Sequence, residues 1–405
     1  MITTFYPPYN FGGDGIIVHR LSNELARRGH KVDVIHCIDT YRFLAHQEPT
    51  TTYDDHPNVT VHGLESKFGF LSPLVTHQTG LPFFKSARIR QILKTGFDVI
   101  HYHNISLVGG PKILEYGEGI KLYTMHDYWL ICPTHVMFRF NRAPCTNPYC
   151  FLCCLTYRRP PQLWRYLNLL EKALKHVDVF ISPNNFIKDL PLQMGLNIPV
   201  VNLSHFVPSL MAAKSTSEGV IYEVSKTPYY LFVGRLERLK GLQTLIPIFR
   251  NYSKAQLLIA GIGSYEPRLR QLAGNSVNIR FLGYQSSSDL QALYRQAVAV
   301  IVPSLCFEVF PLVVIEAFSQ QTPTIVRNIG GLSTTIEEYG GGLVYNTEEE
   351  LVTAMDKFLT DPLYRCELGF HAYKTFQRKW SAETHIKRYF ELIQERAKVR
   401  GKKIN

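Results

Sequence analysis

The sequence lacks the features that mark a membrane-spanning or exported chain. No run of about 18 uninterrupted apolar residues occurs in its 405 residues, so no transmembrane helix is expected. The first ten residues, MITTFYPPYN, have neither a charged start nor an apolar core, so we expect no signal peptide. These absences make the cytoplasm the default location and leave open a peripheral contact with the inner face of the membrane.

The chain also lacks a nucleic-acid-binding signature, despite its positive charge. The net charge of +11 favours an anionic partner. However, no RNA- or DNA-binding module and no arginine-rich arm are present, so we expect no nucleic-acid partner. Acidic membrane surfaces and phosphorylated ligands are the partners that this charge still allows.

What the sequence does contain is a long alternation of apolar β-type runs and amphipathic helical segments. Such an alternation predicts α/β domains with parallel sheets covered by helices on both faces. Two series are present, which favours two doubly wound domains over one very wide sheet. The predicted strands lie at 31–36, 58–63, 97–103, 120–126, 177–182 and 198–204, and then at 228–234, 255–261, 277–283, 297–304 and 322–328.

The two series are separated by a small, polar stretch without a clear period. We therefore predict a linker at 205–227, between a domain at 1–204 and a domain at 228–379. The amphipathic segment within 380–405 has no strand after it. The first strand, in MITTFY, is short for a doubly wound domain, so we expect the native chain to begin a few residues upstream.

Glycine turns and basic residues follow several predicted strands. Arg235 and Lys240, in FVGRLERLKG, lie beyond a strand's carboxyl end, where open α/β sheets bind ligands. An arginine and a lysine there can neutralise a diphosphate. Gly261 and Gly263 form a second turn of this kind and Gly283 a third, although solvated charge and tight packing are the simpler explanations of each one alone.

Two carboxylates lie in the apolar stretch FEVFPLVVIE. Glu308 is in the loop after a buried strand, and Glu316 is in the helix that begins near Pro311. A buried carboxylate needs a partner. Carboxylates bind the paired hydroxyls of a ribose or a hexose, so these residues beside Arg235 and Lys240 indicate a nucleotide-sugar site.

The ordered set GRLERLKG, IAGIGSYEPRL, FLGYQ, FEVFPLVVIEAFS, PTIVRNIGGLSTTI and GGLVYN resembles the retaining glycosyltransferases of family 4. FYPPYNFGGDG and TMHDYW extend the resemblance over the first half of the chain. It implies a GT-B fold, in which two Rossmann-like domains face each other across a cleft. The second domain would hold the nucleotide-sugar donor and the first the acceptor, and the helix in 380–405 would return to the first domain.

The resemblance also implies roles for individual residues. Arg235 and Lys240 would hold the donor diphosphate and stabilise the leaving group, Glu316 would bind the ribose, and Glu308 would contact the sugar. His126, in TMHDYW, would lie near the sugar, although a buried structural histidine is the simpler explanation of that residue alone. The remaining donor-binding residues implied are Gly12, Gly13, Gly261, Gly263, Gly283, Tyr284, Phe310 and Leu312.

A protein of this kind would move one sugar from a nucleotide-sugar donor to a hydroxyl of a glycan, glycolipid or lipid-linked acceptor, with retention of the anomeric configuration. UDP is the default nucleotide, and GDP and ADP stay open. No Asp-x-Asp motif follows a strand, which agrees with transfer that requires no metal or other cofactor. The alternatives are a GT-B epimerase or hydrolase, and a scaffold that binds nucleotide sugars without catalysis.

A cysteine-rich insert at 132–154 departs from the simplest members of that family. In a cytoplasmic protein such clustering favours metal over disulfides. Cys132, Cys145, Cys150 and Cys153 have the residue type for a structural zinc site. A three-cysteine iron–sulfur site and buried free thiols are the alternatives.

A segment at 67–93 combines aromatic and basic residues. Phe68, Phe70, Phe83 and Phe84 lie among lysines and arginines. In similar enzymes the corresponding region often meets lipid-linked acceptors. Peripheral membrane docking and a polar loop with core aromatics are the two interpretations.

Overall fold

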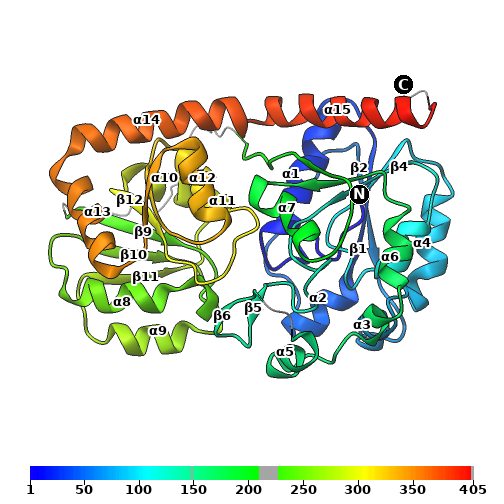
Figure 1. Ribbon diagram of the computed structural model, residues 1–405, viewed down its shortest axis with the longest axis horizontal. Coiled ribbons are helices and arrows are strands. Elements are labelled where there is room, and N and C mark those ends of the chain that lie inside the picture. The colour runs from blue at the N-terminus through cyan, green and yellow to red at the C-terminus, as the bar shows by residue number, and fades with distance from the viewer. Residues whose placement is uncertain (147–148, 209–226, 403–405) are drawn as a thin grey trace. The chain divides into compact units, whose positions relative to one another are not determined.

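The protein folds into two compact α/β units. The computed structural model describes residues 1–146, 149–208 and 227–402 (Figure 1). Most of the predicted linker, residues 209–226, lies outside the described residues. The amino-terminal unit contains residues 1–136, 149–206 and 382–402, and the carboxy-terminal unit contains residues 137–146, 207–208 and 227–381.

The carboxy-terminal unit is built on a six-stranded parallel sheet. Its strands are β9 (Tyr229–Val233), β10 (Gln256–Ala260), β11 (Ile279–Gly283), β12 (Ala299–Val302), β13 (Thr324–Arg327) and β14 (Gly342–Tyr345). They lie in the order β11-β10-β9-β12-β13-β14. The order reverses between β9 and β12, as in a doubly wound Rossmann-like sheet.

Helices cover both faces of this sheet because its strands are apolar on both sides. The helices are α8 (Leu242–Asn251), α9 (Glu266–Ala273), α10 (Ser287–Gln296), α11 (Leu312–Ser319), α12 (Gly331–Tyr339), α13 (Glu348–Thr360) and α14 (Pro362–Lys379). On one face α8, α9 and α13 pack on Tyr230 and Leu257. On the other, α10, α11, α12 and α14 pack on Leu231 and Val300. The predicted α/β fold with helix-covered parallel strands is confirmed.

The sheet of the amino-terminal unit is completed by the first residues of the chain. Its strands are β1 (Val32–Cys37), β2 (Val59–Leu64), β3 (Val99–Tyr102), β4 (Ile120–Thr124), β7 (Val179–Ser182) and β8 (Val200–Asn202). β1 pairs with β2, and the other four pair in the order β3-β4-β7-β8. Ile2 bridges Ile35 of β1 and Tyr102 of β3 in parallel, so the expected short first strand is central. The upstream start stays a prediction.

The last helix of the chain belongs to the amino-terminal unit. The helices here are α1 (Gly13–Arg27), α2 (Ile38–Ala45), α3 (Leu71–Thr79), α4 (Ser86–Leu93), α5 (Cys150–Thr156), α6 (Leu169–Leu174), α7 (Asn185–Gln193) and α15 (Ala382–Val399). Ile386, Leu392 and Ile393 of α15 enter the same core as Val34 and Leu122. This burial accounts for an amphipathic helix that has no strand after it.

The cysteine-rich insert is divided between the units. Its hairpin of β5 (Phe138–Arg139) and β6 (Ala143–Pro144) is antiparallel and groups with the carboxy-terminal unit. Helix α5, which carries three of the cysteines, groups with the amino-terminal unit. The insert is therefore not one separate module.

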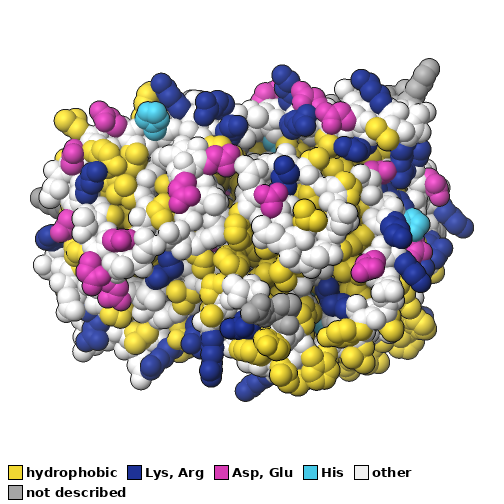
Figure 2. Space-filling view, in the orientation of Figure 1, with side chains coloured by type: hydrophobic (Ala, Val, Ile, Leu, Met, Phe, Trp, Pro, Cys, Tyr) yellow, Lys and Arg dark blue, Asp and Glu magenta, His cyan; other side chains and the backbone are white. Residues whose placement is uncertain are grey.

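Large apolar side chains are exposed over α3 and α5 of the amino-terminal unit (Figure 2). We call this region the apolar surface. It comprises Phe43, Phe68, Phe70, Leu74, Phe83, Phe151, Leu152, Leu155, Leu163, Tyr166 and Leu167. The segment at 163–166 contacts α3, since Trp164 Nε1 donates to the carbonyl of His77 at 2.8 Å. Among the described helices, none is long and apolar enough to cross a bilayer.

Candidate active site

A charged cluster lies where the strand order of the carboxy-terminal sheet reverses. Lys240 ends the 3-10 turn after β9, and Glu308 lies in the loop after β12. Lys240 Nζ donates to Oε1 and Oε2 of Glu308 at 2.7 and 3.0 Å. Ser304 Oγ donates to Oε1 at 2.6 Å. Because β9 and β12 are neighbours, residues 68 positions apart meet at one sheet edge.

This ion pair is largely withdrawn from solvent, with the two side chains 23% and 15% exposed. Burial alone would raise the pKa of the Glu308 carboxyl. The Lys240 charge and the hydrogen bonds from Lys240 and Ser304 outweigh burial and hold that pKa below its ordinary value. Glu308 in turn raises the pKa of Lys240 against the opposing effect of burial. Both groups are therefore charged at neutral pH.

Other residues predicted for the donor follow neighbouring strands or begin α11. Arg235 Nη1 pairs with Glu237 Oε1 at 2.8 Å, and its side chain is 54% exposed. Tyr284, after β11, is also exposed. Glu316 lies in α11, where its Oε2 accepts from the hydroxyl of Tyr294 at 3.2 Å. Phe310 and Leu312 are half-buried where that helix starts. All these residues lie beyond the carboxyl ends of β9, β11 and β12.

The glycines after β10 are required by backbone packing. Gly261 has a φ of 140°, and a Cβ there would lie 2.0 Å from the carbonyl oxygen of Gly234. A Cβ on Gly263 would lie 2.4 Å from the carbonyl oxygen of Leu236. Since no side chain fits in that space, these glycines let the turn after β10 rest on the turn after β9. Gly283, with a φ of 70°, ends β11.

The glycine pair of the amino-terminal unit stands at the start of α1. Gly12 is the residue before the helix and Gly13 its first residue. Gly12 has no side chain that could cap the first N–H groups, and the positive end of the helix dipole lies here. Asp14 follows in the first turn and accepts from Asn104 Nδ2 at 3.2 Å.

His126 lies just after β4, is half-buried, and contacts the buried histidines His103 and His205. Its Nε2 is 2.8 Å from Nδ1 of His103, and its ring stacks on His205 with centroids 4.8 Å apart. Burial lowers the pKa of His126 to about 4, against the opposing charge of Asp127, so the ring is neutral at pH 7. Since β4 ends at Thr124, His126 lies at the carboxyl end of a strand, as predicted.

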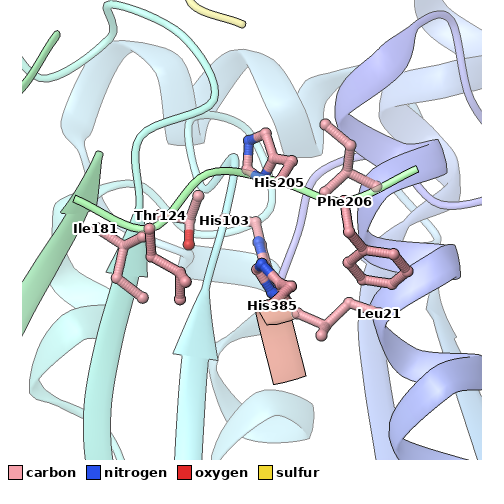
Figure 3. Close-up of a pocket in the computed structure, with 9 residues that line it drawn as sticks. Leu21, His103, Thr124, Ile181, His205, Phe206 and His385 are labelled. Atoms are coloured by element: carbon pink, nitrogen blue, oxygen red, sulfur yellow. The ribbon is translucent and has the colours of Figure 1, made fainter. Parts of the chain in front are cut away.

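A small cavity adjoins this stack (Figure 3). The rings of His103, His205 and His385 gather in it, with Thr124 on one side and Phe206 on the other. Its volume of about 10 Å³ has room for about one water molecule and none for a sugar. The cavity belongs to the packing of the histidines and is not a substrate site.

Four polar residues near these sites were not predicted from the sequence. Ser304 bonds to Glu308, and His103 bonds to His126. Asn104 Nδ2 donates to Asp127 Oδ2 at 3.3 Å, and Asp127 accepts from the Trp129 backbone N–H at 2.9 Å. The sequence does carry one signal for them, which is their position at or just after the ends of predicted strands, in VPS, HYHN and MHD. The roles of His103 and Asn104 were hidden because their partners, His126 and Asp127, each lie 23 residues away in the sequence.

A surface groove of about 540 Å³ lies beyond β1 and β2 of the amino-terminal sheet. Its polar lining includes Asp39, Arg42, Glu65 and Ser66, and its aromatic lining includes Phe43 and Phe70. Arg42 pairs with Glu65 at 2.5 Å. The rings of Phe43 and Phe70 are stacked with centroids 6.1 Å apart. Because these strands are parallel to β4, the groove lies at the same sheet edge as His126.

The cysteines predicted to bind zinc are partly or fully buried. Cys132, Cys145 and Cys150 are half-buried, and Cys153 is buried. Burial and the neighbouring thiols of Cys132 and Cys153 raise the pKa of Cys150. Within the described part of the chain, no group of three or more histidine, cysteine or acidic side chains is placed to hold a metal ion. The zinc site stays a prediction, which metal analysis of protein purified without chelators tests.

Replacing Lys240 with methionine leaves the Glu308 carboxylate without its counter-ion. We expect the free energy of unfolding at about pH 7 to fall by about 3–5 kcal/mol, measured by urea denaturation. The matched control is Lys254→Met, because Lys254 and its partner Asp356 are 60% and 34% exposed. That variant should lose less than about 1 kcal/mol. Equal losses in the two variants would contradict our account.

The same pair sets the sign of a pH dependence. Because the folded pKa of Glu308 lies below 4.5, the pair stabilises the fold above that pH and is lost as the pH falls through the folded pKa. The stability difference between the wild type and Glu308→Gln should therefore shrink on acidification below 4.5. A difference that grows on acidification would show that the pKa is shifted the other way.

Two family descriptions match the chain. The description "Glycosyl transferases group 1" matches residues 216–375, and "Glycosyltransferase Family 4" matches residues 11–202. The chain is 30% identical to the D-inositol 3-phosphate glycosyltransferase of Pseudarthrobacter chlorophenolicus, over 88% of this chain and 84% of that protein. It is 25% identical to an uncharacterized glycosyltransferase of Methanocaldococcus jannaschii, over 94% of each.

Solved structures show the same fold. The sucrose-phosphate synthase of Thermosynechococcus elongatus has a TM-score of 0.75 and 20% identity, over 97% of this chain and 98% of that one. HepE of Anabaena has a TM-score of 0.65 and 14% identity, over 97% and 99%. At these identities the likeness concerns the fold, which is the pair of Rossmann-like domains called GT-B. Together with the family matches, it shows that this chain belongs to the family 4 glycosyltransferases.

Proposed function

We propose that the protein transfers one sugar, with retention of configuration, from a UDP-sugar to a hydroxyl of a glycan, glycolipid or lipid-linked acceptor. The observation that carries this proposal is the cluster of Lys240, Glu308 and Ser304 where the strand order reverses. Open α/β sheets bind ligands at that point. A cation for the diphosphate and a carboxylate for hydroxyls, placed side by side, suit a nucleotide sugar.

The relatives support a nucleotide-sugar donor. HepE of Anabaena was solved in complex with UDP and with UDP-glucose. A GDP-mannose-dependent mannosyltransferase of Corynebacterium glutamicum is 28% identical over 48% of this chain. UDP is therefore the first nucleotide to test, and GDP is the second.

The proposed mechanism is mainly charge stabilisation and positioning. Arg235 and Lys240 stabilise the diphosphate as its bond to the anomeric carbon breaks. The acceptor oxygen forms its bond on the same face of an oxocarbenium-like sugar, and its proton passes to the departing phosphate. Glu308 holds Lys240 in place and contacts the sugar. Transfer without a metal is part of the proposal and rests on the missing Asp-x-Asp motif.

The proposed roles of Glu316 and Glu308 separate binding from turnover. We expect Glu316→Ala to bind UDP at least about 10-fold more weakly in calorimetry, because a hydrogen-bonding carboxylate to the ribose is lost. Glu308→Ala should mainly lower turnover. Glu337→Ala, an exposed change in α12, is the control and should bind UDP as the wild type does. Unchanged UDP affinity in Glu316→Ala would exclude the ribose role.

We place the acceptor's sugar head group in the groove beyond β1 and β2. The groove offers carboxylates and an arginine for hydroxyls, and exposed rings of Phe43 and Phe70 on which a sugar face can stack. Arg42 is already neutralised by Glu65 and by Glu48, each at 2.5 Å. The groove therefore suits a neutral polyhydroxyl group better than a phosphate.

Phe43 and Phe70 also belong to the apolar surface, which would rest on a lipid bilayer (Figure 2). A contiguous apolar patch larger than a few hundred square ångströms is rare on a protein that stays in water. Exposed cations lie in the same segments, at Lys67, Arg158 and Arg159. Apolar contact together with positive charge favours a membrane that contains anionic lipids.

Vesicle sedimentation tests this membrane contact. We expect the wild type to bind vesicles of phosphatidylcholine and phosphatidylglycerol. The double variant Phe83→Ser/Leu152→Ser should bind at least roughly 10-fold more weakly, because two apolar side chains no longer enter the lipid. Leu363→Ser, a change in α14 at an apolar residue that is even more exposed, should bind as the wild type does. Equal binding of all three proteins would exclude this surface.

A further inference from the structure

The groove beyond β1 and β2 has a polar floor that the fold of the amino-terminal unit holds in place. Asp39 lines the groove and is only 4% exposed. Both of its carboxyl oxygens accept from the backbone N–H group of Ser66, at 3.2 and 3.0 Å. The buried Lys85 donates to Ser72 Oγ of α3 at 3.0 Å, and α3 packs on α2. The floor is therefore fixed by α2, α3 and the loop after β2.

The rim of the groove is aromatic and continues into the apolar surface. Phe43 and Phe70, which are 41% and 55% exposed, line the groove and also belong to that surface (Figure 2). Exposed apolar side chains continue at Leu71 and Leu74 of α3 and at Phe68 in the turn before it. A ligand whose polar part lies in the groove therefore meets apolar side chains along one edge.

The charges of the groove disfavour a phosphate. Its ionisable lining residues are Asp39, Arg42, His46 and Glu65. Among the described residues of the lining, Arg42 is the only lysine or arginine, and both Glu48 and Glu65 pair with it at 2.5 Å. Two carboxylates thus surround one guanidinium group, so a phosphate here would meet a net negative charge. A sugar joined to a lipid through a phosphate or diphosphate fits this groove poorly.

We propose that the acceptor is a neutral glycolipid, in which a sugar is bound directly to a lipid with no phosphate between them. The sugar lies in the groove, with hydroxyls at Asp39 and Glu65 and one face on Phe43 or Phe70. The hydrocarbon chain leaves over these two rings and lies along the apolar surface. The inference rests on the proposed function only for the statement that this ligand is the acceptor.

Calorimetry with defined probes tests this substrate class on the full chain, without nucleotide or transfer. The neutral probes are methyl and octyl glycosides of glucose, galactose and mannose, kept below the concentration at which the octyl forms make micelles. For at least one sugar, the octyl form should bind at least roughly 10-fold more tightly than the methyl form, because several methylene groups leave water. The absence of this preference for all three sugars would overturn the proposal.

The linkage is tested with the octyl phosphodiester of the same sugar. It should bind at least roughly 10-fold more weakly than the directly linked octyl glycoside, because its charge meets the two glutamates. Equal or tighter binding of the phosphodiester would overturn the proposal. So would equal kcat/KM for methyl and octyl acceptors in a transfer assay, which would leave the transferase itself intact and assign it a water-soluble acceptor.

Variants of the rim test the route of the hydrocarbon chain. Phe43→Ser/Phe70→Ser should bring the affinities for the octyl and methyl forms to within about threefold of each other, because the two rings no longer cover the chain. Phe370→Ser, in α14, is the control, because Phe370 is also an exposed ring, at 49%, and should keep the preference. An undiminished preference in the rim variant would place the chain elsewhere and contradict the proposal.

Releasing Arg42 provides the reciprocal test, in which binding is gained. Glu48→Gln/Glu65→Gln removes both carboxylates from Arg42, so the octyl phosphodiester should bind at least roughly 10-fold more tightly than it binds the wild type. The matched control is Glu391→Gln/Glu395→Gln, which removes two exposed carboxylates from Arg388 in α15 and should change nothing. Unchanged binding in the first variant would show that charge in the groove does not select the ligand.

Discussion

The ion pair between Lys240 and Glu308 joins the two loops on which the proposed donor site depends. One loop follows β9 and the other follows β12, the strands between which the sheet order reverses. The same loops are joined elsewhere, because a Cβ on Gly241 would lie 1.9 Å from the carbonyl oxygen of Pro303. Arg327 also donates to that oxygen, at 3.1 Å. Compared with an apolar pair of similar volume, a buried ion pair adds little net stability, although removing only one partner is costly. We therefore propose that its value lies in fixing a cation where a diphosphate would arrive.

In the amino-terminal unit, too, the polar groups considered for function lie beyond the ends of the strands. Parallel strands that are buried on both faces can present polar side chains only beyond their ends. The glycine pair, the histidine stack and the groove all lie beyond the carboxyl ends of this sheet. Burial lowers the pKa of His126 to about 4, so its ring is neutral at pH 7. The carboxy-terminal unit thus offers an ion pair beyond its strand ends, and the amino-terminal unit offers neutral imidazole rings there.

The fold was largely predictable because its signals are local. Runs such as PYYLFVG and AQLLIAG are too apolar for a half-exposed strand, so two helix-covered parallel sheets followed. The positions of Lys240, Glu308 and His126 at strand ends were predictable for the same reason. Their partners were not, since Glu308 lies 68 residues from Lys240 and His103 lies 23 residues from His126. The central place of Ile2 in the sheet was not predicted either, because the order of strands depends on pairing between segments that are far apart in the sequence.

The central claim is that the chain is an active transferase that retains configuration. The most direct measurement is NMR of the product formed from UDP-glucose, or from another sugar of a UDP-sugar panel, with a membrane lipid extract as acceptor. Our account predicts UDP release and a new glycosidic linkage with the anomeric configuration of the donor. An inverted linkage, or free sugar released without any acceptor, would contradict it.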